Sequence, residues 1–529
     1  MNQELIKGKF SVGYDRQVVT PAIGTWLGGY GNGPDRATIG KIYEDDDLFV
    51  TAIALTDKRG ETVMPITVDL VRMPLGLFRE ARERIVKETG IKEKNIIISA
   101  THSHSSPDAL DGAESMKEWF ALFLDKCTVA AKNAMEDRKP AEIYCGVREV
   151  ENLNFVRRYM KDGKFLGTNA KGDAHESESD NHLQLLKFVR EGAKDILLMN
   201  WGAHPDHSKT IGGESGTPEF HRGCSADYIY PLRKAIEQKT GMNFAFFEAA
   251  AGNLNARSNM PEEHARVEAR AEKEGVKRFI AYGETLADEV FALLDTPLSK
   301  LSDGNAEGAE GEVTVYRPEG VEVGGERYNQ AVAIAAVIYK RPIENPTKET
   351  LEAADRLTEK FELGSAEDID RAAADPNDPH YPHALCVKVL REGGRMPITN
   401  EAVRNCAIEL SRYFKFTSGP YGTAGMINRA HNAQKPPYKM PVYALSCGDI
   451  AFACAPAEIF DTNGMEVKAA SPFKFTFYVE QTGGTYGYFP SKLAWSHGGY
   501  ELDTTSGAEG TAESIAEGLI TLLNELKAR

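Results

Sequence analysis

Two groups of histidines follow apolar, strand-like runs in this chain. His102 and His104 lie in THSHSSPD, directly after NIIISA (95–100). Residues two apart in extended backbone face the same side, so both imidazoles can converge on one point. Because imidazole is a common zinc ligand, the pair predicts part of a metal site. The alternative is two unrelated surface histidines in a polar loop.

His204 ends a second apolar run, DILLMNWGA (195–203), in the sequence WGAHPDH. Sheets of α/β proteins bind ligands at the carboxyl ends of their strands, and zinc sites collect ligands from several elements. We therefore expect 95–108 and 195–207 to be neighbouring strands whose ends meet, with His102 and His204 sharing one metal. His207 is either a further ligand or, with Asp206, a hydrogen-bonding support.

Glu458 is a carboxylate in an apolar setting, since it follows the strand-like run AFACAPA. A buried carboxylate is costly unless it is paired or bound to a metal. Glu458 is thus a candidate ligand. The alternative places it near a helix N-terminus, where negative charge is favoured.

The elements that must position these residues alternate between strand and helix patterns, which predicts an α/β fold with a mixed sheet core and flanking helices. The predicted strands are 49–55, 62–70, 95–100, 183–189, 195–203 and 243–250, and the predicted helices are 76–90, 114–136, 226–238 and a long polar stretch over 261–295. Residues 300–325 are interpreted as a connection into short strands.

The domain organisation follows from a change of character after residue 326. Residues 1–326 are predicted to form the first part of the α/β core. Residues 327–412 are predicted to form an inserted helical or cap lobe, with helices at 327–340, 347–362 and 398–412 around the Asp/Pro-rich ADPNDPHYPH. Residues 413–529 then complete the core with further strands and a helix over 511–528.

The bulk composition excludes several classes of protein. The apolar fraction of 42% and charged fraction of 26% are those of an ordinary globular chain. A net charge of −16 argues against nucleic-acid binding, which needs clustered Lys and Arg. No apolar window reaches the roughly 20 residues of a membrane helix. The N-terminus lacks signal-peptide features, and seven cysteines without a CxxC pair suit a reducing compartment. We expect a cytoplasmic protein with a small-molecule substrate and no nucleic-acid or membrane partner; a homo-oligomer is left open.

Several segments, in order, resemble the blocks of the neutral/alkaline ceramidase family, catalytic domain only. They are GGYGNG (28–33), IIISATHSHSSPDAL (96–110), MNWGAHPDHS (199–208), CSADYIYPLRKAIE (224–237), FFEAAAGNLN (246–255), CAPAEIF (454–460) and YGYFPSKLAWSHGGYE (486–501). The similarity runs from about residue 9 to the C-terminus and is weakest over 300–400.

The resemblance implies one zinc ion per chain, held by His102, His204, Glu458 and Tyr488. It also implies that His104, an arginine and Tyr500 stabilise the oxyanion. The arginine is Arg157 in NFVRRY, with Arg158 as a near competitor. A zinc ion that activates water and polarises a carbonyl, combined with donors at the developing charge, is a coherent hydrolytic site.

Two departures from that family bear on function. The proposed nucleophilic serine of ceramidases is replaced by Asn255 in GNLNAR, and an amide cannot be a nucleophile. The family also continues into a β-sandwich domain, whereas this sequence stops at Arg529. Because the sequence shows neither an export signal nor a lipid-facing apolar segment, ceramide itself is not expected as substrate.

The sequence therefore predicts a zinc-dependent hydrolase that cleaves an amide or ester bond of a small soluble substrate by zinc-activated water. Two alternatives stay open: a zinc enzyme of another class, such as a lyase or a sugar-processing hydrolase, and a non-catalytic metal- or ligand-binding relative. Retention of the oxyanion donors His104, Arg157 and Tyr500 argues against the last.

Overall fold

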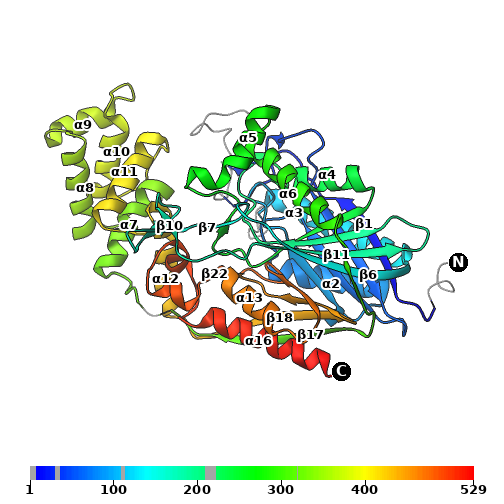
Figure 1. Cartoon of the computed structure of the whole chain (residues 1–529). Coiled ribbons are helices and arrows are strands. Elements are labelled where there is room, and N and C mark those ends of the chain that lie inside the picture. The colour runs from blue at the N-terminus through cyan, green and yellow to red at the C-terminus, as the bar shows by residue number, and fades with distance from the viewer. Residues whose placement is uncertain (1–6, 30–35, 109–113, 209–221, 319) are drawn as a thin grey trace.

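The computed structural model describes residues 7–29, 36–108, 114–208, 222–318 and 320–529. A mixed α/β body carries a separate group of helices on one side (Figure 1). The predicted α/β class with flanking helices is confirmed. Of the segments that carry the family resemblance, residues 30–33 and 109–110 lie outside the described residues.

The main sheet has the strand order β14-β12-β11-β6-β1-β3-β4-β5, with β16 paired to β6. Its strands are β1 (Ser11–Val18), β3 (Phe49–Thr56), β4 (Thr62–Val68), β5 (Ile96–Ala100), β6 (Lys139–Glu149), β11 (His182–Arg190), β12 (Ile196–Trp201), β14 (Asn243–Glu248) and β16 (Ser299–Leu301). The pairs β4–β5 and β12–β14 are parallel and the other pairs are antiparallel. Strands β4, β5 and β12 are buried along their whole length, as expected of strands covered on both faces.

The two ends of this sheet approach each other in space. The Thr67 hydroxyl on β4 donates to the Phe246 carbonyl on β14 at 2.8 Å. Gln481 accepts a hydrogen bond from the Ala100 amide, and the Glu480 amide donates to the Glu248 carbonyl. The expectation that 95–108 and 195–207 are neighbouring strands is therefore wrong, because β5 and β12 belong to opposite halves of the sheet order. Their carboxyl ends nevertheless meet, since the sheet curls.

A second sheet, ordered β17-β18-β19-β21, completes the body. It contains β17 (Ala306–Val315), β18 (Tyr438–Cys447), β19 (Ile450–Cys454) and β21 (Phe475–Val479). The predicted connection over 300–325 thus contains a ten-residue strand. The apolar face of α16 (Thr511–Lys527) packs on this sheet through Leu519 and Leu523, which are fully buried with Val442 and Ala444.

The remaining helices of the body are α2 (Leu75–Thr89), α3 (Glu114–Glu136), α4 (Ile229–Thr240), α5 (Ala265–Glu274), α6 (Arg278–Leu294), α13 (Asp461–Ala470), α14 (Lys492–Trp495) and α15 (Tyr500–Thr504). Helix α2 ends at Gly90, whose left-handed φ of 74° lets its amide bond Val86. The single helix expected over 261–295 is interrupted, because Gly275 terminates α5 in the same left-handed conformation.

Short strands and 3-10 turns connect these elements around the ends of the sheets. They are β2 (Gly40–Lys41), β7 (Phe155–Val156), β8 (Arg158–Lys161), β9 (Lys164–Thr168), β10 (Ala174–His175), β13 (Gly223–Cys224), β15 (Leu254–Asn255), β20 (Glu458–Ile459), β22 (Tyr488–Phe489), η2 (Glu93–Asn95), η3 (Pro261–His264) and η4 (Pro420–Gly422).

The group of helices at one side, called here the helical lobe, has an apolar core of its own. Its helices are α7 (Glu326–Tyr339), α8 (Lys348–Lys360), α9 (Ala366–Ala374), α10 (Tyr381–Glu392), α11 (Glu401–Tyr413) and α12 (Thr423–Ala433). Helices α9 and α10 were not predicted; α9 ends where the Asp/Pro-rich segment begins, and α10 starts within that segment at Tyr381. Ser365 and Asp368 form a capping box that starts α9.

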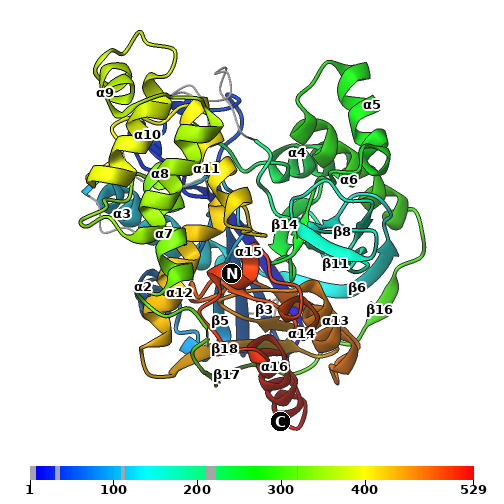
Figure 2. The same ribbon diagram turned by 90° about the vertical axis from the view of Figure 1, so that its left-hand side faces the viewer.

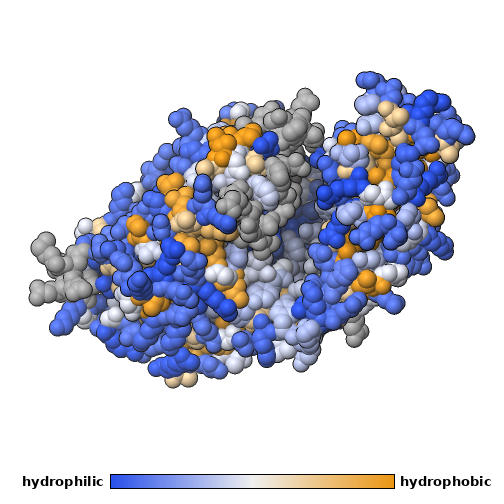
Figure 3. Space-filling view, turned by 180° about the vertical axis from the view of Figure 1, so that it is seen from behind, coloured by the Kyte–Doolittle hydropathy of each residue, from blue (hydrophilic) through white to orange (hydrophobic). Residues whose placement is uncertain are grey.

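The lobe contacts the body at α15. Gly425 on α12 lies so close to Thr504 that an added Cβ would stand 2.9 Å from the Thr504 Cα. Arg429 donates to the Leu502 carbonyl at 3.0 Å. Figure 2 shows α12 beside α15, and in Figure 3 the surface is hollowed between the lobe and the body. Among the described residues, no helix has the length and apolar character required to cross a membrane.

Candidate metal centre

His102 leaves the end of β5 in a strained backbone conformation. Its φ is +65°, a left-handed value that a non-glycine residue rarely adopts. The Nδ1 of His102 donates to the Val71 carbonyl at 2.6 Å. Because Nδ1 carries the proton, the lone pair of Nε2 faces away from that carbonyl and is available for a metal.

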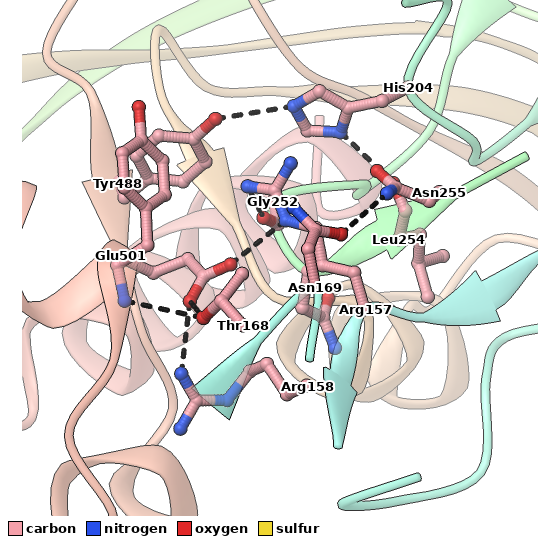
Figure 4. Close-up of polar contacts among 12 residues, drawn as sticks. Arg157, Arg158, Thr168, Asn169, His204, Gly252, Leu254, Asn255, Tyr488 and Glu501 are labelled. Atoms are coloured by element: carbon pink, nitrogen blue, oxygen red, sulfur yellow. Dashed lines mark hydrogen bonds and ion pairs between the residues drawn. The ribbon is translucent and has the colours of Figure 1, made fainter. Parts of the chain in front are cut away.

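His204 is held in the same way at the end of β12. Its Nδ1 donates to the Leu254 carbonyl at 3.0 Å, and its side chain is fully buried (Figure 4). Its Nε2 accepts from the Tyr488 hydroxyl at 3.2 Å. The His102 and His204 ring centroids are 4.7 Å apart. The ends of β5 and β12 therefore bring the two imidazole rings together.

Glu458 and Tyr488 come from the C-terminal part of the chain and stand side by side. They are paired residues of the parallel strands β20 and β22. Gly252 lies against this pair, because a Cβ at Gly252 would be 2.5 Å from the Glu458 carbonyl oxygen. A glycine at this position lets the loop after β14 approach the Glu458 backbone.

The donor atoms of these residues are spaced as around one ion. The Oε2 of Glu458 is 3.3 Å from the Nε2 of His102 and 3.3 Å from the Nε2 of His204. That oxygen is buried and makes no hydrogen bond within the described residues. Bonds of about 2.0–2.1 Å to a tetrahedral zinc put neighbouring ligand atoms about 3.3 Å apart. The residues present therefore fit a zinc ion held by two imidazoles, a carboxylate and a phenol oxygen.

The protonation states also suit a metal centre. Burial raises the pKa of Glu458, but His102 and His204 outweigh it and hold that pKa well below the usual range. Burial and the Arg157 guanidinium lower the pKa of His204. A carboxylate and neutral imidazoles are the forms that bind zinc.

His104 belongs to the same histidine group. Its Nε2 is 3.3 Å from the Nε2 of His102, and the ligand atoms of His102, His104 and His204 all lie within 4.8 Å of one another. Burial and then the neighbouring His102 lower the pKa of His104, so it is neutral at pH 7. Gly29 packs directly against His104. Only glycine fits there, because φ is +87° and a Cβ would lie 2.4 Å from the His104 Cβ.

Arg157 faces the phenol rings of the centre. Its guanidinium carbon lies 5.3 Å from the Tyr488 ring centroid and 5.8 Å from that of Tyr500. The Arg157 Nε donates to Glu501 at 2.9 Å and Nη2 donates to the Gly252 carbonyl at 2.9 Å (Figure 4). Burial acts against its charge, but Tyr488 and Glu501 outweigh burial and raise the pKa of Arg157.

Arg158, the competitor of Arg157, points elsewhere. Its Nε and Nη2 donate to Glu176 and its Nη1 donates to Glu501. Its guanidinium lies over the rings of Phe165 and Phe460. Arg158 is thus part of a buried ion network beside the centre, whereas Arg157 lies against the tyrosines of the centre.

Tyr500 is the first residue of α15, and its ring centroid is 5.6 Å from that of Tyr488. Burial raises the pKa of Tyr500, although Arg157 acts in the opposite direction, so the phenol keeps its proton at neutral pH. Tyr339, the last residue of α7 in the helical lobe, is close enough to Tyr500 to interact with it electrostatically. Burial and Tyr500 together raise the pKa of Tyr339.

Asn255, in place of the serine of the resembling family, forms a parallel bridge with His204. Its Nδ2 donates to the Asn169 side-chain oxygen at 3.0 Å. The serines that could substitute as nucleophile are engaged in the local structure: Ser105 accepts from Ser208, Ser106 donates to the Ser103 carbonyl, and Ser225 accepts from the Asp227 amide.

The Nδ1 of His207 lies 3.2 Å from a carboxylate oxygen of Asp206, and the His207 amide donates to Asp227. Within the described chain, His207 is not among the metal-spaced histidines. It therefore supports the loop after β12.

Sequence reasoning missed several buried acids and one amide. Glu501 bridges Arg157, Arg158 and Thr168. Glu248 and Glu480, both fully buried, accept hydrogen bonds from the amides of Ala203 and Ala251 directly behind the centre. Asn169 orients Asn255. Of these residues, only Glu501 could have been suspected from the sequence, because it directly follows the predicted site residue Tyr500.

Comparison with known proteins bears on this fold. No family model matches the chain. Neutral ceramidase of Pseudomonas aeruginosa is 22% identical over 179 residues, which cover 32% of this chain and 25% of that protein. The crystal structure of neutral ceramidase from Pseudomonas aeruginosa matches with a TM-score of 0.60 and 14% identity, covering 98% of this chain and 75% of that one. A structure of ceramidase complexed with C2 matches with a TM-score of 0.61 and 14% identity, covering 98% and 76%.

Fold and centre together define an α/β protein with a histidine-rich, metal-type site at the curled end of a mixed sheet. Its architecture is that of the neutral ceramidase structures, so the resemblance seen in the sequence is confirmed for the fold. In sequence, the alignment spans a quarter of the length of the curated relative.

Proposed function

We propose that this chain is a zinc-dependent hydrolase that cleaves an amide or ester bond of a small soluble substrate. One observation carries the proposal: the Oε2 of Glu458 lies 3.3 Å from the Nε2 of both His102 and His204, and the Tyr488 hydroxyl lies 3.2 Å from the Nε2 of His204. Nitrogen and oxygen donors at this spacing suit a tetrahedral zinc ion. The fold similarity to neutral ceramidases supports hydrolysis as the reaction class.

The reaction adds water to an acyl carbon and breaks the bond from that carbon to nitrogen or oxygen. The leaving atom takes up a proton from the water, so the products are a carboxylic acid and an amine or alcohol. When bound, zinc would polarise the acyl oxygen and lower the pKa of water.

The residues of the chain supply the rest of the chemistry. Tyr500 keeps its proton and can donate to the oxygen on which negative charge develops, and Arg157 stays cationic beside it. Neutral His104 is a further donor at the same centre. Glu501 fixes the guanidinium of Arg157, so its position is set before the substrate binds.

A panel of small N-acyl amides and O-acyl esters tests this function. The expected result is hydrolysis by zinc-loaded protein, loss of activity on chelation and its return with zinc. Hydrolysis that is indifferent to chelation would contradict the metal-dependent mechanism. A fully zinc-loaded protein that hydrolyses no member of the panel would favour a non-catalytic binding role.

A further inference from the structure

Asn255 stands on the same side of the backbone as His204. The two residues are partners in a parallel bridge, and paired residues of neighbouring strands project to the same face. Nε2 of His204, on that face, is 3.3 Å from Glu458 and 3.2 Å from Tyr488. The Asn255 side chain therefore lies beside His204, a donor of the candidate metal centre (Figure 4).

The orientation of the Asn255 amide is set by Asn169. Nδ2 of Asn255 donates to Oδ1 of Asn169 at 3.0 Å. Asn169 is itself held, because its amide donates to the Arg157 carbonyl at 2.7 Å and its carbonyl accepts from Asn259 at 2.6 Å. With its nitrogen engaged, Asn255 has its carbonyl oxygen left for another partner.

That oxygen is a buried acceptor. Asn255 is 8% exposed, and its Oδ1 has no hydrogen-bond partner among the residues that the structure describes. A buried acceptor without a partner is costly, and such a group at a site calls for a donor. The side chain of Asn255 thus presents a buried acceptor beside His204.

We propose that Oδ1 of Asn255 accepts a hydrogen bond from the N–H of the substrate, so that the substrate is a secondary or primary amide and not an ester. This inference rests on the proposed hydrolase function. An amide carries a donor on the atom next to the scissile carbonyl, whereas an ester carries an oxygen there that can only accept. A site that pairs a buried group with a substrate N–H discriminates strongly against an analogue that lacks it.

A matched pair of tetrahedral analogues tests the inference on the zinc-loaded protein: a phosphonamidate, with N–H, and the phosphonate with oxygen in its place. The wild type should bind the phosphonamidate about tenfold or more tightly relative to the phosphonate. Asn255→Ala should bring this ratio close to one, because the acceptor is removed. Asn255→Asp should preserve the preference, because it keeps an acceptor at the same place.

The outcomes separate the inference from the function on which it rests. The inference is overturned if the wild type shows no preference for the phosphonamidate, or if wild type and Asn255→Ala prefer it equally. In either case, binding of both analogues leaves the proposed hydrolase function standing. If neither analogue binds zinc-loaded wild type, the proposed function fails and the inference fails with it. If Asn255→Ala does not fold, the inference is tested by the ratio of phosphonamidate to phosphonate affinity in the wild type and in Asn255→Asp.

Discussion

Replacing Glu501 by Gln should damage the centre through Arg157. Glu501 is fully buried and accepts hydrogen bonds of 2.9 Å from Arg157 Nε, Arg158 Nη1 and the Thr168 hydroxyl. The two arginine side chains are only 6% and 0% exposed. A glutamine keeps one acceptor oxygen and turns an NH2 group toward a donor. Breaking a buried ion pair in this way costs about 3–5 kcal/mol.

The assay combines denaturant unfolding with turnover on a substrate from the amide and ester panel. We expect Glu501→Gln to lose stability by that amount and to lose turnover on the order of 10²-fold, because Arg157 is no longer fixed. Glu176→Gln is the matched control. The Glu176 side chain is only 3% exposed and binds Arg158 and His497, and among the described residues it is not a hydrogen-bond partner of Arg157.

The control should therefore lose stability while retaining most of the turnover. The reasoning is refuted if Glu501→Gln is as stable as the wild type, or if both variants lose turnover to the same extent.

Two further predictions concern Tyr500 and Asp46. Tyr500→Phe should lower kcat about 10–100-fold with little change in KM, because its hydroxyl acts on charge that develops in the transition state; a raised KM at unchanged kcat would show a ground-state role instead. Burial raises the pKa of Asp46 from 3.8 to about 8, so the native state binds this proton more tightly than the unfolded state. The contribution of Asp46 to the free energy of unfolding therefore falls as pH rises between these two values. Asp46→Asn should thus gain stability relative to the wild type as pH is raised from about 4 to about 8, by no more than about 6 kcal/mol at 1.36 kcal/mol per unit. Urea unfolding at both pH values measures this, and an equal difference at both would contradict it.

Local patterns predicted six of the nine strands of the main sheet, but not β1, β6 or β16. The helix over 114–136 has the predicted bounds, and the strands that precede His102 and His204 lie where the Ile- and Leu-rich runs indicated them. The α/β class follows from this alternation. Helices α9 and α10 were missed because Asp and Pro dominate the segment between them, although Ser365 and Asp368 mark the start of α9.

Strand order was not readable from the sequence in the same way. The curl that brings β5 to β12 depends on contacts such as Thr67 with Phe246 and Ala100 with Gln481, which are distant in sequence. Such pairings leave no periodic signal. For the same reason the roles of Glu501 and Asn169 became visible only in three dimensions, since their partners lie hundreds of residues or several elements away.

The most direct test of the account is the zinc content of purified protein after equilibration with zinc and removal of the unbound metal. The account predicts about one zinc ion per chain in the wild type and in His431→Ala, whose histidine bonds Tyr328 in the helical lobe. It predicts loss of the metal in His204→Ala and Glu458→Gln, which remove donors of the centre. A wild type that retains no zinc, or a His204→Ala variant that retains a full ion, would contradict it.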